Sequence, residues 1–388
     1  MKRQLDRRAQ RARNFARLWA RASVALGFLL VFAMSACSKQ VMNPNLNLER
    51  LLPYASKKPR VYFTQTTDGR SLALHRTEPN QIREGLPPLI LCHDEGMNKW
   101  AWDLGGRRSF IKFFSQLGFD VWALEFRGHG ESSKPEWHNE RPYDWNFDDY
   151  VHKDLPAAVT FVQGQTNSRY VTMIGHGIGA MAIYAYLETE NFFDEVANAV
   201  LIAPPGFAAD YSPEMKELLA LQQNWDGLDP MSLVHLPSRT DSWELFSRLM
   251  LTGTPIPKIR IKRLSQRGME VISPKVLQQT LHWVEANDFL SADLNFSYRN
   301  KLALIRLPVL VIAGTHDNFA PPGVVNYGYR VITAEDKTLM IFGRDYGHLD
   351  NYSHLGLLLG VHAHEEVFPR IFEWIEERTE NFDVWGKL

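Results

Sequence analysis

The chain has 388 residues, of which 45% are hydrophobic, and it contains 11 Trp and 22 Phe. This apolar content excludes a disordered or fibrous protein and is enough for a large buried core. The formal net charge is −1, but residues 1–36 hold eight basic residues and one acid, so they carry +7 and the rest of the chain carries −8. An acidic mature chain argues against a nucleic-acid partner.

Residues 1–36 have the pattern of a signal peptide. Basic residues from Lys2 to Arg21 precede an apolar run from Ala22 to Ala36, as in the n-region and h-region of such peptides. The run is shorter than the roughly 20 residues of a membrane-spanning helix. A cleaved signal is therefore favoured, and an uncleaved signal anchor is the alternative.

The apolar run ends in Met34-Ser35-Ala36-Cys37, which resembles the lipobox of bacterial lipoproteins. The resemblance implies that Cys37 is lipidated and becomes the first mature residue, and that Ser38 directs the protein to the outer membrane. We therefore expect a protein of the bacterial cell envelope, held by a lipid anchor and facing the periplasm.

The sequence after the signal predicts an α/β domain. Residues 37–60 resemble a tether, and two strand-like runs at 61–67 and 71–77 flank the turn signal Asp68-Gly69. Further runs typical of strands follow at 88–92, 120–126, 170–174, 198–203, 308–313 and 338–343. Helical periodicity lies between them at 108–117 and 148–163, and an amphipathic helix near 365–378 closes the chain. This alternation predicts a mostly parallel sheet with helices on both faces.

A long connection divides this domain. The core is expected in two parts, 61–206 and 301–388, and residues 207–300 lie between them with helix-like patterns at 242–251 and 273–288. Connections of this length are usually functional, so we expect a helical lid.

Four segments carry the expected chemistry. Gly175-His176-Gly177-Ile178-Gly179 follows a strand and opens a helix, as in the G-x-S-x-G elbow, but Gly177 occupies the nucleophile position and has no side chain. His93-Asp94-Glu95 follows the strand 88–92, where an oxyanion loop is expected to act together with Ile178. Asp317 and His348 stand at the positions of the triad acid and base.

These segments resemble the acid-lipase-like branch of the α/β-hydrolase superfamily and its bacterial lipase and esterase relatives. The likeness covers residues 60–378 and rests on GFDVWALEFRGHGES, WNFDDYVHKDLPAAVTFV, the elbow, PVLVIAGTHDNFAPP and YGHLD. The resemblance implies a lipase fold with an inserted lid. Two residues depart from the catalytic pattern of that family: Gly177 replaces the serine nucleophile, and Asp94 replaces the glycine of the oxyanion loop.

The leading hypothesis is a lipid-anchored pseudo-hydrolase that binds an apolar or acyl-bearing small molecule. One alternative is an active hydrolase in which His348 and Asp317 activate water directly, and another is a scaffold for a protein partner. The glycine-rich turn at 175–180 also resembles a dinucleotide-binding motif, but two strand units precede it instead of following it, which argues against that site. No cofactor is therefore expected. No Cys, His or carboxylate group has metal-ligand spacing.

Overall fold

The computed structural model describes residues 57–83, 85–104, 106–134, 144–188, 195–206, 212–214 and 240–380. The expected signal peptide, Cys37 and most of the tether lie outside these ranges. Within them, no helix has the length and apolar character needed to cross a membrane.

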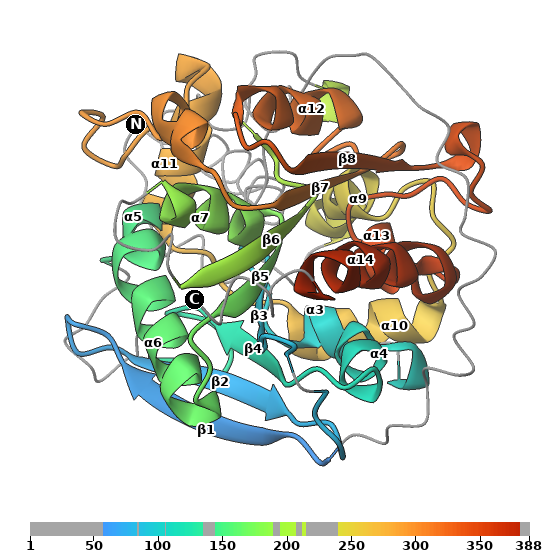
Figure 1. The fold of residues 1–388 in the computed structure, drawn as a ribbon. Helices are drawn as coiled ribbons and strands as arrows, with labels where there is room; N and C mark the ends of the chain where they lie inside the picture. The colour runs from blue at the N-terminus through green and yellow to red at the C-terminus, as the bar shows by residue number, and fades with distance from the viewer. Residues whose placement is uncertain are drawn as a thin grey trace, which may run out of the picture.

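An eight-stranded sheet forms the centre of the domain, in the order β1-β2-β4-β3-β5-β6-β7-β8 (Figure 1). The strands are β1 Arg60–Gln65, β2 Ser71–Thr77, β3 Leu89–Cys92, β4 Val121–Glu125, β5 Val171–His176, β6 Val196–Ile202, β7 Val309–Gly314 and β8 Lys337–Phe342. β2 runs antiparallel to β1 and to β4, and all other neighbours are parallel. The α/β fold class and the opening hairpin predicted from the sequence are therefore confirmed.

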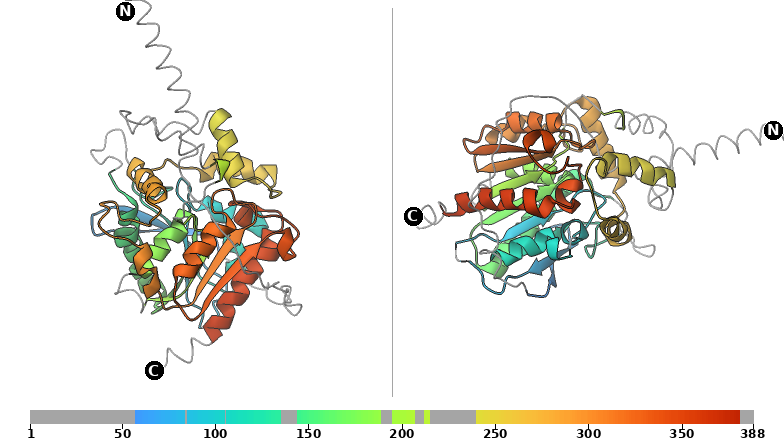
Figure 2. Two further views of the ribbon diagram at one scale, coloured as in Figure 1. Left: turned by 90° about the horizontal axis from the view of Figure 1, so that it is seen from above. Right: turned by 90° about the vertical axis from the view of Figure 1, so that its right-hand side faces the viewer.

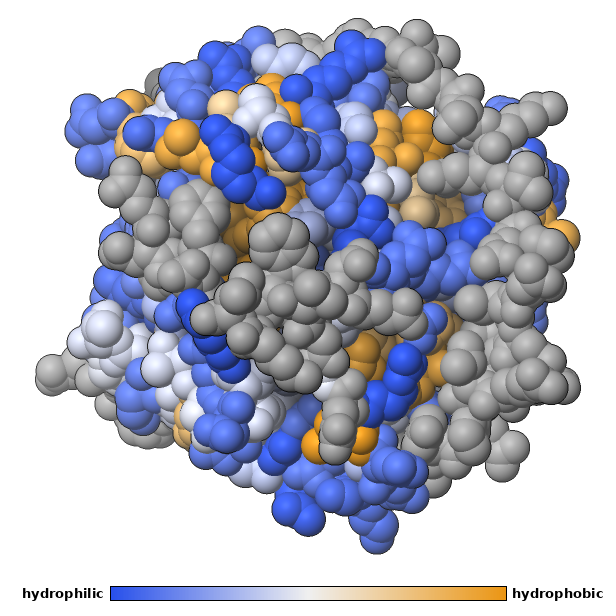
Figure 3. Space-filling view, viewed as in Figure 1, coloured by the Kyte–Doolittle hydropathy of each residue, from blue (hydrophilic) through white to orange (hydrophobic). Residues whose placement is uncertain are grey.

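Helices cover both faces of the sheet, which is why its central strands are apolar throughout. α4 Phe110–Gln116 and α14 Ala363–Glu380 contact each other on one face. α6 Leu155–Thr166, α7 Ile178–Leu187 and α12 Pro322–Val331 contact the strands on the other face (Figures 1 and 2). On the face of the molecule shown in Figure 3, apolar side chains are visible in several separate areas.

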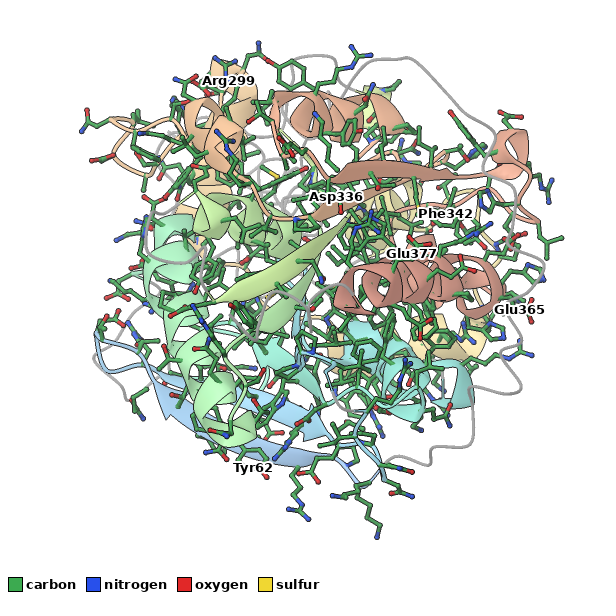
Figure 4. The ribbon with its side chains drawn as sticks, in the orientation of Figure 1. Tyr62, Arg299, Asp336, Phe342, Glu365 and Glu377 are labelled. Carbon is green, nitrogen blue, oxygen red and sulfur yellow. The ribbon has the colours of Figure 1, made fainter. Side chains whose placement is uncertain are left out.

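The closing helix α14 packs against α4 near its start and is held beside β8 near its end. Phe368 lies 4.9 Å from Phe110 and 5.7 Å from Phe113, measured between ring centroids. Farther along, Arg378 donates to both carboxylate oxygens of Asp336, just before β8, at 2.8 and 2.7 Å. Figure 4 labels Asp336 near this end of the helix, beside Glu377. The same view places Tyr62 and Phe342 at opposite edges of the sheet.

The described part of the expected lid, residues 240–300, includes α9 Thr240–Met250, α10 Lys258–Arg263 and α11 Pro274–Ala286. Met269 forms an antiparallel bridge with Met97, in the loop after β3. The Glu270 carboxylate accepts from Asn98 in the same loop and from Gly130, after β4. This segment thus packs over the loops at the carboxyl ends of two central strands.

Candidate active site

The candidate site is built from loops at the carboxyl edge of the sheet. β3 ends at Cys92 and leads to Asp94, β5 leads to Gly177, and β7 leads to Asp317. β3 and β5 are neighbours, with Cys92 paired to Gly175. Because parallel strands end at the same edge, these loops converge.

Gly177 forms the sharp turn between β5 and α7. Its φ of 55° and ψ of −123° are strained for any residue with a side chain. Its N–H donates to the carbonyl of Ile202 at 3.0 Å. Gly179 lets the start of the helix approach the backbone of Cys92 and His93, where a Cβ would overlap their carbonyl oxygens. The strand, turn and helix expected of a nucleophile elbow are present without the nucleophile.

The carboxylate of Asp94 fills the space that a side chain at Gly177 would take. A Cβ built on Gly177 would overlap Cγ and both carboxylate oxygens of Asp94. Asp94 itself has no exposed surface. The two residues that depart from the lipase pattern are therefore coupled, because the glycine makes room for the acid.

Two backbone N–H groups hold one oxygen of this carboxylate. Oδ1 of Asp94 accepts from Ile178 N at 2.7 Å and from Glu95 N at 2.8 Å. An oxyanion hole is made of such donors, the first from the residue after the nucleophile and the second from the loop after β3. In this protein the carboxylate of Asp94 already occupies both.

The other oxygen of Asp94 faces His354. Nε2 of His354 lies 3.0 Å from Asp94 Oδ2, and Nδ1 lies 2.8 Å from Asp317 Oδ2. Oδ1 of Asp317 accepts from the N–H groups of Phe319 and Ala320 at 2.9 and 2.7 Å. The result is a buried chain of acid, imidazole and acid, in which a carboxylate stands where a triad has its serine hydroxyl.

The structure does not bring His348 to Asp317, so the predicted pairing of these two residues is wrong. Nδ1 of His348 lies 3.1 Å from the Gly343 carbonyl, and its ring packs on Phe342 at 4.7 Å. After β8 the chain is largely exposed up to Leu349 and turns inward from Asp350, and His354 is the histidine of that buried stretch. The apolar run that follows His354, at 355–359, was the signal that could have distinguished the two histidines.

The electrostatics of the centre favour a charged imidazole. Burial lowers the pKa of His354, but Asp317 and Asp94 outweigh this effect and raise the pKa to about 9. Burial also raises the pKa of Asp94, while hydrogen bonds from His354 and two backbone N–H groups oppose that shift and favour the anion. A charged His354 can donate a proton but cannot accept one. By contrast, burial and the nearby His354 hold the pKa of His176 well below its ordinary value, so His176 is neutral.

His93 and Glu95 flank Asp94 in the loop after β3, and each makes hydrogen bonds that fix this loop. Nδ1 of His93 lies 2.8 Å from the Asp94 carbonyl, and Nε2 accepts from Phe126 N at 3.1 Å. Burial raises the pKa of Glu95 to about 8, although a hydrogen bond from Tyr150 opposes the shift. His93 therefore positions the loop, while Glu95 contributes its backbone N–H to the hole.

The fold assembles a group of possible metal ligands that sequence spacing does not reveal. One ligand atom each from Asp94, His176 and His354 lies within 4.8 Å of the others. However, Nδ1 and Nε2 of His354 already face Asp317 and Asp94, and an imidazolium has no lone pair for a metal. An ion could bind only by displacing that proton.

Comparisons with known proteins agree with this fold. The family model described as "alpha/beta hydrolase fold" matches residues 87–355. Human lipase member J is 22% identical, with 86% of this chain and 100% of that protein covered. Gastric triacylglycerol lipase of Bos taurus is 20% identical, with 92% and 99% covered. The structure of an esterase from Thermogutta terrifontis has a TM-score of 0.52 at 19% identity and covers 83% of this chain and 100% of its own.

Proposed function

Because the chain belongs to the alpha/beta hydrolase fold family, we propose that it is a lipase-type or esterase-type protein that has lost serine acyl-enzyme chemistry. It keeps a site for an apolar or acyl-bearing ligand. One observation carries the proposal: the Asp94 carboxylate fills both the nucleophile position above Gly177 and the oxyanion hole.

The carboxylate blocks acyl transfer in two ways. Gly177 offers no hydroxyl to attack an ester carbonyl. The developing oxyanion would also find Ile178 N and Glu95 N already bound to Asp94. Loss of one such donor costs about 10²–10³ in rate, and two negative charges about 4 Å apart repel by about 4 kcal/mol at an effective dielectric of about 20.

Three further features support the ligand class and the location. The chain is similar over most of its length to proteins named as lipases, one of them a triacylglycerol lipase, and triacylglycerols are apolar esters. Residues 240–300 reach the loops of the site, since the backbone carbonyl of Arg248 in α9 accepts from Asn318, beside Asp317, and Met269 pairs with Met97 in the loop after β3. The lipobox-like Cys37 would tether the domain to the membrane in which such ligands reside.

The alternative of direct water activation needs a neutral base beside the substrate. His354 takes the place of His348 in that alternative, and the two carboxylates keep it protonated near neutral pH. Water activation by His354 is therefore disfavoured while Asp94 is ionised.

Labelling with an alkyl fluorophosphonate tests the proposal. The mature wild-type protein should show no adduct by intact-mass measurement, while the double variant Gly177→Ser/Asp94→Gly, which restores a hydroxyl and empties the hole, should be labelled. A stoichiometric adduct on any Ser of the wild type would contradict the proposal.

A further inference from the structure

We propose that the outward face of α10, together with the π-helical turn η4 Leu264–Gly268 that follows it, is a docking surface for anionic phospholipid headgroups. The residues of this surface, the basic face, are Lys258, Ile259, Lys262, Arg263 and Arg267. The inference goes beyond the proposed function, because it assigns a membrane contact to the folded domain itself. It does not depend on the chemistry of the candidate active site.

The basic residues of this segment are concentrated in a chain that is otherwise acidic. Five Lys or Arg residues lie between positions 258 and 267, and no Asp or Glu lies between positions 245 and 269. The chain after the expected signal carries a net charge of −8. A strong local excess of positive charge on such a protein attracts an anionic partner to one surface and not to the rest of the molecule.

The helix α10 presents these charges on one side. The first four members of the basic face are exposed, and their spacing of i, i+1, i+4 and i+5 places them together. Arg260 and Leu264 point the other way and are buried. Ile259 is 53% exposed, so an apolar group stands among the charges. Basic residues mixed with exposed apolar ones are typical of helices that lie on a membrane surface.

The basic face is held in place on both sides. Nη1 of Arg260 donates to the carbonyls of Leu359 and Gly360 at 2.8 and 3.0 Å. After η4, the N–H of Glu270 donates to the carbonyl of Gly96 at 2.8 Å. The exposed charges therefore lie on a segment that is fixed to the domain.

Interactions within the protein do not account for these charges. Of the ion pairs among the described residues, none includes a basic residue of this face. The helix dipole favours Lys262 and Arg263 in the last turn of α10. The same dipole disfavours Lys258, which begins the helix. A partner outside the described part of the chain is the remaining explanation.

Further cations extend the basic face toward η1 Gly106–Arg108. Burial and the nearby charge of Arg108 lower the pKa of the Arg260 guanidinium, so two cations lie close to each other. The carboxylate of Glu365, which Figure 4 labels at the start of α14, lies 3.3 Å from Nε2 of His364. An anion that binds beside these arginines would relieve their mutual repulsion.

Trp100, in α3 beside η4, favours a lipid surface over a soluble acidic polymer (Figure 1). The ring is half-buried, and the cationic ends of Lys99 and Arg267 each lie 5.2 Å from its centre. Tryptophan rings and long basic side chains gather at the membrane–water interface. A phospholipid surface offers both a phosphate for the cations and an apolar layer for Ile259 and the indole.

The test is limited acetylation of lysines in the mature protein on two kinds of vesicle, followed by peptide mass spectrometry. One kind is phosphatidylcholine alone, and the other contains about one-third phosphatidylglycerol. We expect Lys258 and Lys262 to react about fivefold more slowly on the anionic vesicles, since a basic residue near such a surface gains about that factor. Lys301, which is exposed before β7, should react equally on both. Each lysine reports its own contact, so the comparison holds with or without an acyl chain.

Two double variants separate the basic face from general charge. Lys262→Gln/Arg263→Gln should restore most of the reactivity of Lys258 on anionic vesicles. Salt at 0.5 M should do the same, because it shortens the screening length to about 4 Å. The matched control Lys58→Gln/Arg169→Gln removes two exposed cations that precede β1 and β5, and it should leave the protection of Lys258 unchanged. Circular dichroism checks that each variant is folded.

Two outcomes would overturn the inference. The first is equal reactivity of Lys258 and Lys262 on the two kinds of vesicle. The second is protection by inorganic phosphate or by polyglutamate without protection by anionic vesicles, which would assign the basic face to a soluble anion or an acidic protein. The proposed function fails separately, through fluorophosphonate labelling of a Ser, and that result would leave the lysine reactivities unchanged.

Discussion

Asp94 and Gly177 lie on loops that follow neighbouring parallel strands, and the carboxylate of Asp94 occupies the volume that a side chain at position 177 would need. The vacant nucleophile position is thus filled by a group with its own charge and hydrogen bonds.

Gly177→Ser alone should destabilise the protein and leave ester hydrolysis weak. The new Cβ would sit at a φ of 55° and overlap the Asp94 carboxylate, and we expect a loss of about 2–5 kcal/mol from backbone strain and overpacking. Gly177→Ser/Asp94→Gly should recover the packing part of that loss. Urea denaturation and kcat/KM on one short-chain p-nitrophenyl ester would measure both effects.

The double variant should exceed the sum of the two single changes in kcat/KM, because the hydroxyl and the emptied hole are needed together. Full esterase activity from Gly177→Ser alone would show that Asp94 moves aside without cost.

The two histidines after β8 should behave differently in the Gly177→Ser/Asp94→Gly background. His354→Ala should abolish ester hydrolysis, with a loss of at least about 10²-fold, because His354 is the residue paired to Asp317. His348→Ala should keep most of the activity, since its ring contacts Gly343 and Phe342. The opposite result would restore His348 as the base.

Glu95→Gln should flatten the dependence of stability on pH. The pKa of Glu95 is about 8 in the folded protein and its ordinary value is 4.5. The folded state therefore holds a proton that the unfolded state releases, and stability is lost as pH rises from 4.5 through 8. Gln should remove this contribution, of the order of several kcal/mol, and still accept from Tyr150.

The measurement for Glu95→Gln is the free energy of unfolding in urea at pH 5, 6.5 and 8. Glu335→Gln, at an exposed position, is the matched control and should follow the wild type. Parallel curves for all three proteins would contradict the pKa of Glu95 given above.

Cys37→Ala should abolish lipidation, because the thiol of this residue is the expected attachment point. The variant should appear as an unprocessed or soluble species in cell fractionation. Mass spectrometry of the wild type should find acyl chains on an N-terminal Cys, and a mature N-terminus without them would end this prediction.

The sequence predicted the fold well because the signals for buried strands are local. Apolar runs such as 88–92 and 308–313 became β3 and β7 within a residue, and the closing helix became α14. The elbow at Gly177 and the acid Asp317 were also visible, because each directly follows a strand.

The partner of Asp317 could not be found in the same way. His348 and His354 lie in one loop after β8, and local pattern does not say where that loop turns inward. The role of Asp94 depends on its contact with Ile178, 84 residues away in the chain, which sequence spacing does not reveal. Tertiary packing determines both the partner of Asp317 and the role of Asp94.

The overlap of Asp94 with position 177 also sets the order of evolutionary steps between this centre and a serine-based one. A chain with a serine at position 177 and an acid at position 94 would hold two side chains in one space, so it is the disfavoured intermediate in either direction. Loss of the hydroxyl must come first, and the acid can enter only the gap that remains. Once the acid is present at position 94, a change of Gly177 back to Ser alone would meet steric overlap with the carboxylate and repulsion from its charge. The acid is therefore retained.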